Sequence, residues 1–112
     1  MKLPNSTKAV VEREKIVAYL LDATHPDNGG KARFFESLGF RRNQWAALAT
    51  ALQTLAGGAE VTASAKTAHG RKYVMVGKIN SPSGKSPLVM TVWIVDSGAD
   101  SPRLVTAYPH EE

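Results

Sequence analysis

The chain has 112 residues, with 14 lysines and arginines against 10 aspartates and glutamates, and no cysteine. This length fits one domain, residues 1–112, which can bury a core without disulfides or a structural metal. The lack of cysteine excludes thiol nucleophiles, zinc–thiolate sites and iron–sulfur clusters. No apolar run approaches the ~20 residues that cross a bilayer, and no signal peptide is evident, so we expect a soluble, cytoplasmic protein with no membrane partner.

The net charge of +4 is unevenly distributed along the chain. Residues 61–95 contain five basic residues and no acidic one: Lys66, Arg71, Lys72, Lys78 and Lys85. A sheet of one sign is typical of a protein that binds a phosphate backbone. Lysines that prevent the exposed edge strands of an ordinary sheet from pairing with other chains would give the same pattern, so both interpretations remain open.

The first part of the chain has helical spacing of apolar residues. Residues 8–11 predict a short extended segment, and residues 12–23 predict a helix with Ile16, Tyr19 and Leu20 on one face. The His-Pro pair that follows ends this helix, because a residue before proline is pushed away from helical geometry.

Two more helices are predicted after a glycine-containing loop over residues 27–30. The first spans residues 31–38 and is capped by Gly39. Asn43 is the expected N-cap of the next helix, which the glycine pair at positions 57 and 58 ends.

After this glycine pair the apolar period changes to two. Turn signals separate four predicted strands, over residues 61–66, 71–79, 88–95 and 103–108. Consecutive strands joined by short turns predict an antiparallel meander. The expected fold class is therefore α+β, with N-terminal helices packed on a four-stranded antiparallel sheet.

The residues available for chemistry favour reactions on phosphodiesters. The three histidines have no metal-ligand spacing, so we expect neither a metal site nor a cofactor. No phosphate-binding glycine loop or nucleophile elbow is present, and paired carboxylates are scarce in the strand half. A metal-independent ribonuclease needs only proton-transferring groups and cations that stabilise the charge on phosphate.

Several residues suit those roles, each with a structural alternative. Lys31 and Arg33 begin a helix, where cations oppose the macrodipole, so helix stability does not explain them. Arg103 and Thr106 lie three residues apart, and strict alternation places them on opposite faces unless a bulge intervenes. Thr106 shares a face with Tyr108, so geometry favours these two residues as members of one site over Arg103 and Thr106.

Two blocks of sequence resemble a bacterial domain family. The first runs from His25-Pro26 through residues 31–35 to 38–40, and the second comprises residues 89–93 and 102–108. This family resembles the C-terminal toxin tips of contact-dependent inhibition and filamentous-haemagglutinin proteins. The resemblance covers most of the chain, from Leu3 to Pro109.

The resemblance implies a barnase-like, colicin-tRNase-like or RelE-like domain. It implies a toxin-type, metal-independent endoribonuclease that cleaves RNA, with tRNA as one candidate, and that is neutralised by a cognate antitoxin or immunity protein. The candidate catalytic residues are His25, Lys31, Arg103 and Thr106. His25 would transfer protons, and Lys31 and Arg103 would stabilise the phosphate charge. The candidate RNA-binding residues are Arg33, Thr91, Tyr108, Arg71 and Lys72.

Two other functions remain open at this point. The same scaffold suits a non-catalytic module that binds RNA or another protein. It also suits a structural or immunity-like protein that binds its partner through the last strand. A growth assay distinguishes these functions from a toxin, because only a toxin should arrest the growth of cells in which the protein is expressed.

Overall fold

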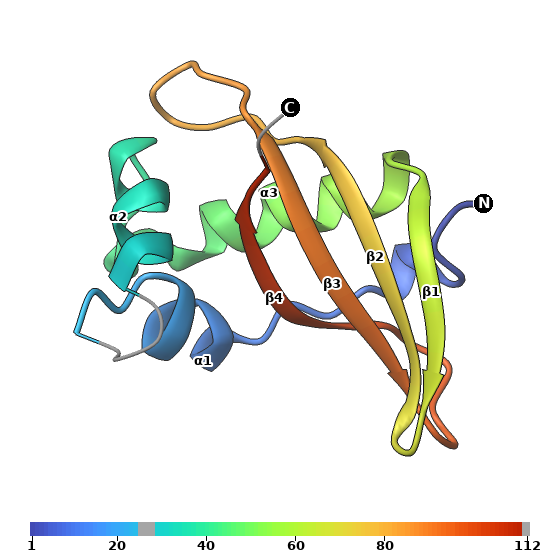
Figure 1. The fold of residues 1–112 in the computed structure, drawn as a ribbon. Coiled ribbons are helices and arrows are strands. Elements are labelled where there is room, and N and C mark those ends of the chain that lie inside the picture. Colours follow the sequence, from blue (N-terminus) through green and yellow to red (C-terminus); the bar gives the residue numbers. More distant parts are fainter. Residues whose placement is uncertain (25–28, 111–112) are drawn as a thin grey trace.

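The computed structural model describes residues 1–24 and 29–110. Three helical elements precede four strands, which confirms the α+β class (Figure 1). The helical elements are α1 (Arg13–Lys15), which continues as a π-helical turn η2 (Ile16–Leu20), then α2 (Gly29–Ser37) and α3 (Trp45–Gly58). The strands are β1 (Val61–Thr67), β2 (Gly70–Lys78), β3 (Leu88–Asp96) and β4 (Arg103–Pro109). Short 3₁₀ turns lie at Ser6–Lys8 and Arg42–Gln44.

The strands form one antiparallel sheet in the order β1-β2-β3-β4, which confirms the predicted meander. Gly70 opens β2 directly after the first hairpin turn, with a φ of +148°. A side chain at this position would overlap the carbonyl oxygen of Val95 on the neighbouring strand. The tight hairpin therefore requires glycine.

The core lies between α3 and one face of the sheet. Leu48, Leu52 and Leu55 of α3 are buried against a cluster that includes Trp93 and Met75. Trp93 is fully buried and fills the centre of this core. Figure 1 shows α3 crossing behind the strands, with α1 and α2 beside β4. Over the opposite face of the sheet lies none of the helices in the part of the chain that the structure describes.

The helix boundaries differ from the predictions in four places. The second helix covers Gly29–Ser37, so it begins inside the predicted loop rather than at residue 31. The first helical segment ends at Leu20 rather than residue 23, because it widens into a π turn in which Leu21 N donates to Ile16 O over 2.8 Å. Asn43 is not an N-cap, since it lies inside a 3₁₀ turn and Gln44 takes the cap position. The third helix runs through Gly58 and ends before Ala59. The His-Pro pair expected to end the first helix, residues 25 and 26, lies outside the described residues.

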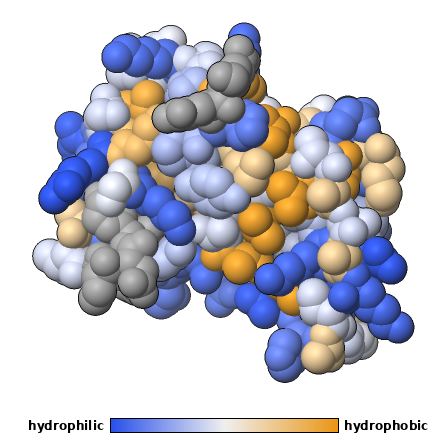
Figure 2. Space-filling model, in the orientation of Figure 1, coloured by the Kyte–Doolittle hydropathy of each residue, from blue (hydrophilic) through white to orange (hydrophobic). Residues whose placement is uncertain are grey.

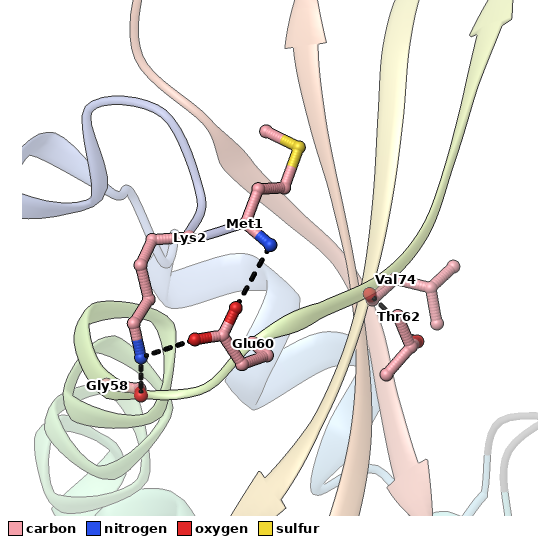
Figure 3. Close-up of polar contacts among 6 residues, drawn as sticks. All are labelled: Met1, Lys2, Gly58, Glu60, Thr62 and Val74. Atoms are coloured by element: carbon pink, nitrogen blue, oxygen red, sulfur yellow. Dashed lines mark hydrogen bonds and ion pairs between the residues drawn. The ribbon is translucent and has the colours of Figure 1, made fainter.

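The N-terminal segment holds the two edges of the sheet. Val10 forms a parallel bridge with Arg103, accepting a hydrogen bond from Leu104 N at 3.0 Å, which confirms an extended backbone at this point. At the opposite edge, the N-terminal ammonium and Lys2 both pair with Glu60 (Figure 3). No helix among the described residues is long and apolar enough to cross a membrane.

Candidate functional site

A bulge in β4 determines which side chains share the open face of the sheet. Thr106 lies opposite Val92, but Leu104 lies opposite Trp93, so Val105 is an extra residue. Arg103 lies opposite Ile94, two residues from Val92, and directly opposed residues point to one face. Arg103 and Thr106 therefore share a face, because the bulge supplies the extra residue that strict alternation lacked.

This shared face is the one without a helix, and it combines an apolar centre with a basic rim. Figure 2 shows orange apolar surface on this side of the molecule, with blue hydrophilic residues around it. The pairing register places a continuous row of residues from three strands on it: Lys72, Val74, Val76, Met90, Val92, Ile94, Thr106 and Tyr108. Ile94 is 5% exposed yet lies outside the main core cluster, so neighbouring side chains on this face cover it.

A polar cluster lies where α2 and η2 meet the β4 edge of this face. The Nζ of Lys31, from α2, donates to the phenol oxygen of Tyr19 at 2.6 Å and to Oγ1 of Thr106 at 3.1 Å. The Tyr19 and Thr106 oxygens are themselves 3.4 Å apart. The three side chains are partly buried and come from three different elements. We call Lys31, Tyr19 and Thr106 the lysine cluster.

The charge of Lys31 has no carboxylate partner among residues 1–24 and 29–110. It lies 4.9 Å from the centre of the Tyr19 ring and 5.7 Å from that of Tyr108. None of the ion pairs formed by the described residues includes Lys31. Within the described part of the chain this partly buried ammonium contacts hydroxyls and aromatic rings, and an ammonium in such surroundings can attract an anion.

The lysine cluster changes the acidity of Tyr19. Burial alone would raise its pKa, but hydrogen bonds from Lys31 and Thr106 and the charges of Lys31 and Lys15 outweigh burial. The net effect lowers the pKa of Tyr19 below its ordinary value of 10.0. A phenol with a lowered pKa loses its proton more readily and can accept one from a substrate hydroxyl.

Arg103 shares the face of the lysine cluster but its guanidinium is engaged elsewhere. Its Nε and Nη2 donate to the two carboxylate oxygens of Asp96, at 2.7 and 3.0 Å. These hydrogen bonds lower the pKa of Asp96 and raise that of Arg103. Along β3, Val92 lies opposite Thr106, Ile94 lies opposite Arg103, and Asp96 follows two residues later. The guanidinium that binds Asp96 is therefore directed away from Thr106. The structure thus brings Lys31 and Thr106 together and leaves Arg103 apart from them.

Thr91 is a correction to the predicted site. It is fully buried, and its hydroxyl accepts a hydrogen bond from Nε1 of Trp93 at 2.9 Å. It points into the α3 side of the sheet, because the polar indole nitrogen needs a partner in the core. Thr91 therefore cannot contact RNA.

The remaining candidates are dispersed over the surface. Arg33 is exposed, but two residues along a helix place it on a different side of α2 from Lys31. Arg71 and Lys72 are exposed neighbours on β2, so they point to opposite faces, and only Lys72 shares the face of Thr106. Tyr108 joins the lysine cluster through its ring, while its hydroxyl donates to Sδ of Met90 at 2.7 Å. His25 lies outside the described residues.

Sequence reasoning missed Tyr19 and Asp96 as members of the site. Tyr19 falls at helical spacing with Ile16 and Leu20, so its pattern indicates core. Its phenol group, which needs a hydrogen-bond partner when buried, is the one signal that distinguished it. Asp96 is the first acidic residue after the uncharged and basic stretch of residues 61–95, and that position next to a loop was the available signal.

The described residues contain no group of three or more histidines, aspartates or glutamates placed to hold a metal ion. The site consists of an ammonium, a phenol, a hydroxyl and a neighbouring arginine–aspartate pair. Such groups bind anions and move protons without a metal.

Comparisons of the sequence and of the fold relate this chain to known proteins. A family model described as "Domain of unknown function (DUF6883)" matches residues 2–111, so the chain belongs to this family. A chain of a solved structure titled "Contact-dependent growth inhibition toxin - immunity protein complex from Klebsiella pneumoniae 342" has the same fold, with a TM-score of 0.73 and 19% sequence identity. The similarity covers 96% of this chain and 97% of that one. No curated protein matched in the corresponding sequence comparison.

Proposed function

We propose that this protein is a metal-independent endoribonuclease of the bacterial toxin type. The observation that carries the proposal is the position of Lys31 Nζ, within hydrogen-bond distance of both Tyr19 and Thr106 on the uncovered face of the sheet. This arrangement offers a cation, a proton acceptor and a hydroxyl donor within one site. These are three of the groups that suit cleavage of an RNA phosphodiester, to which a proton donor for the leaving group must be added.

The reaction is an internal transfer in which the ribose 2′-oxygen attacks the adjacent phosphorus. The bond from the 2′-oxygen to phosphorus forms, and the bond from phosphorus to the 5′-oxygen breaks. One proton leaves the 2′-hydroxyl and one proton is added to the departing 5′-oxygen. The products are a 2′,3′-cyclic phosphate and a 5′-hydroxyl, with no co-reactant consumed.

The residues of the lysine cluster suit distinct roles in this step. Lys31 would stabilise the negative charge that develops on the phosphate oxygens. Tyr19, whose pKa is lowered, would accept the proton of the 2′-hydroxyl, and Thr106 would donate a hydrogen bond to a phosphate oxygen. His25, predicted as a general base or acid, lies outside the described residues; with Tyr19 as the base, it would take the acid role and donate a proton to the leaving group. The ring of Tyr108 offers a surface on which a base can stack.

The toxin role is proposed from the fold together with the charge. The structural neighbour comes from a complex whose title names both a growth inhibition toxin and its immunity protein. A net charge of +4 would favour both RNA and an acidic neutralising protein as partners. Arg33, Arg71 and Lys72 remain predicted contacts to the RNA backbone outside the lysine cluster.

The direct test is incubation of the purified protein with total tRNA in EDTA. Cleavage that leaves 2′,3′-cyclic phosphate ends is expected, and it should persist in EDTA because the lysine cluster supplies the charge. Intact RNA, under conditions in which barnase cuts the same preparation, would refute the proposal.

The alternative is a non-catalytic module that binds RNA or a protein partner. The observation in its favour is that Lys31, Tyr19 and Thr106 already satisfy one another and so fasten α2 to β4. This alternative predicts salt-dependent binding of RNA without cleavage and normal growth on induced expression. Growth arrest that Lys31→Ala relieves would exclude it.

A further inference from the structure

We infer that Arg103 and Lys72 form a second phosphate subsite on the open face, next to the lysine cluster, and that Asp96 competes with RNA for Arg103. The inference rests on the proposed function, because it concerns the same RNA chain. It adds a requirement that the proposal lacks: the substrate must present at least two consecutive phosphates.

The position of the subsite follows from the register of the sheet. Lys72 and Arg103 both lie directly opposite Ile94, one on each side, so the two cations flank it on the open face. Thr106 lies opposite Val92, two residues away, so the subsite is displaced from it by about 7 Å along the strand direction. A phosphodiester chain that crosses the lysine cluster can therefore place its next phosphate near Arg103.

The ion pair between Arg103 and Asp96 shows the geometry of ligand that the Arg103 guanidinium can bind. Two parallel hydrogen bonds of 2.7 and 3.0 Å join the guanidinium to both oxygens of one carboxylate. A phosphate group presents two oxygens that match the same fork. The carboxylate of Asp96 thus occupies the place that two phosphate oxygens would take.

The exchange of Asp96 for phosphate is energetically feasible because the ion pair is exposed. The side chain of Arg103 is 41% exposed to solvent and that of Asp96 is 38% exposed. Exposed ion pairs contribute little net stability, so a phosphate that is also bound by Lys72 can displace the carboxylate. Lys72 is exposed, and none of the ion pairs among the described residues includes it.

The experiment compares two uncleavable probes, a 2′-O-methyl dinucleotide with one phosphodiester and a 2′-O-methyl trinucleotide with two. The methyl group removes the attacking hydroxyl, so affinity is measured without cleavage. The wild-type protein should bind the two-phosphate probe at least about fivefold more tightly than the one-phosphate probe, as one added charge-assisted contact implies. Isothermal titration calorimetry at fixed low salt gives both dissociation constants.

Three variants of the subsite and one control variant separate the subsite from the lysine cluster. Arg103→Ala should abolish the preference for two phosphates, and Asp96→Asn should increase it, because the competing charge is removed. Arg103→Lys should retain part of it, since the charge remains but the fork is lost. Lys85→Ala, which removes an exposed cation from a distant loop, should leave the preference unchanged. The ratio of the two constants is insensitive to a partial loss of folded protein.

Each result has a defined meaning. A preference that survives Arg103→Ala, or that Asp96→Asn fails to increase, overturns the subsite. Absence of a preference in the wild-type protein also overturns it, even if RNA is cleaved at the lysine cluster. The expected preferences together with intact RNA in the cleavage assay would support the subsite and refute the ribonuclease.

Discussion

Lys31 and Thr106 are 75 positions apart in the sequence, yet the Nζ of one lies 3.1 Å from the Oγ1 of the other. The contact joins α2 to β4 at the border of the open face of the sheet. It also places an ammonium that forms no ion pair with any described residue beside a tyrosine whose pKa is lowered. Our predictions concern this contact and the fold that makes it possible.

Replacing Lys31 should affect catalysis far more than folding. Lys31→Ala should reduce the rate of RNA cleavage at least about tenfold, because it removes the charge that stabilises the transition state. The melting temperature should fall by only a few degrees, because the hydrogen bonds to Tyr19 and Thr106 are lost but no ion pair within the described residues is broken. Lys85→Ala is the matched control, because it removes an equal charge from an exposed loop. Equal losses of rate in both variants would assign the effect to net charge alone.

The pH dependence of cleavage should report Tyr19. The Tyr19 phenolate accepts the 2′-hydroxyl proton, so one limb of the pH–rate profile should follow the titration of Tyr19, whose pKa lies below the ordinary 10.0, and the proton donor to the leaving group should set the other limb. Removing Lys31 takes away a hydrogen bond and a charge that favour the phenolate, so Lys31→Ala should move the Tyr19 titration to higher pH. Ultraviolet absorbance of the phenolate, with Tyr19→Phe as reference, measures this. An unchanged titration in Lys31→Ala would contradict the coupling.

The hydroxyl group of Thr106, as distinct from the size of its side chain, should contribute to the rate of RNA cleavage. Thr106→Val keeps the shape of the side chain and removes its hydrogen bonds to Lys31 and Tyr19. We expect a loss of about fivefold in cleavage rate, the value of one hydrogen bond of about 1 kcal/mol. Thr62→Val makes the same chemical change at an exposed position in β1 and should leave the rate unaffected. Identical rates for wild type and Thr106→Val would exclude Thr106 from the site.

Two glycines should respond to alanine in opposite directions. Gly70→Ala should destabilise the fold by about 1–3 kcal/mol, because a side chain at φ +148° would meet the backbone of Val95. Gly57→Ala should stabilise it by about 0.5–1 kcal/mol, because Gly57 is in the last turn of α3 with no atom near the added carbon. Urea unfolding of both variants measures the difference. A stable Gly70→Ala protein would show that the hairpin tolerates a side chain.

The strand half of this fold was predictable because the local signals agree with one another. The alternation of apolar residues and the turns at Gly70 and Gly84 identify the strands, and short connections make a meander the simplest topology. The site was only partly predictable. Alternation does not reveal that Val105 bulges, because no glycine or proline marks the position, and the bulge is what places Arg103 and Thr106 on one face.

Burial and pairing explain the remaining differences between sequence and structure. Thr91 lies two residues from the buried Trp93 on β3, so alternation places both on the core face, where the Thr91 hydroxyl pairs with the indole. Its polar side chain favoured a site role that this burial rules out. Arg103 reaches Asp96 because the hairpin returns β4 alongside β3, seven positions away. Tyr19 belongs to the site because a helix and a strand distant in sequence converge there, and local periodicity does not reveal such convergence.

The central claim is that the lysine cluster cleaves RNA without a metal. The most direct measurement is the rate at which wild-type protein and Lys31→Ala produce 2′,3′-cyclic phosphate ends from tRNA in EDTA. Both proteins are first matched for folded fraction by circular dichroism. Our account predicts cleavage by the wild-type protein and a loss of at least about tenfold in Lys31→Ala. Uncut RNA with the wild-type protein, or equal rates for the two proteins, would contradict it.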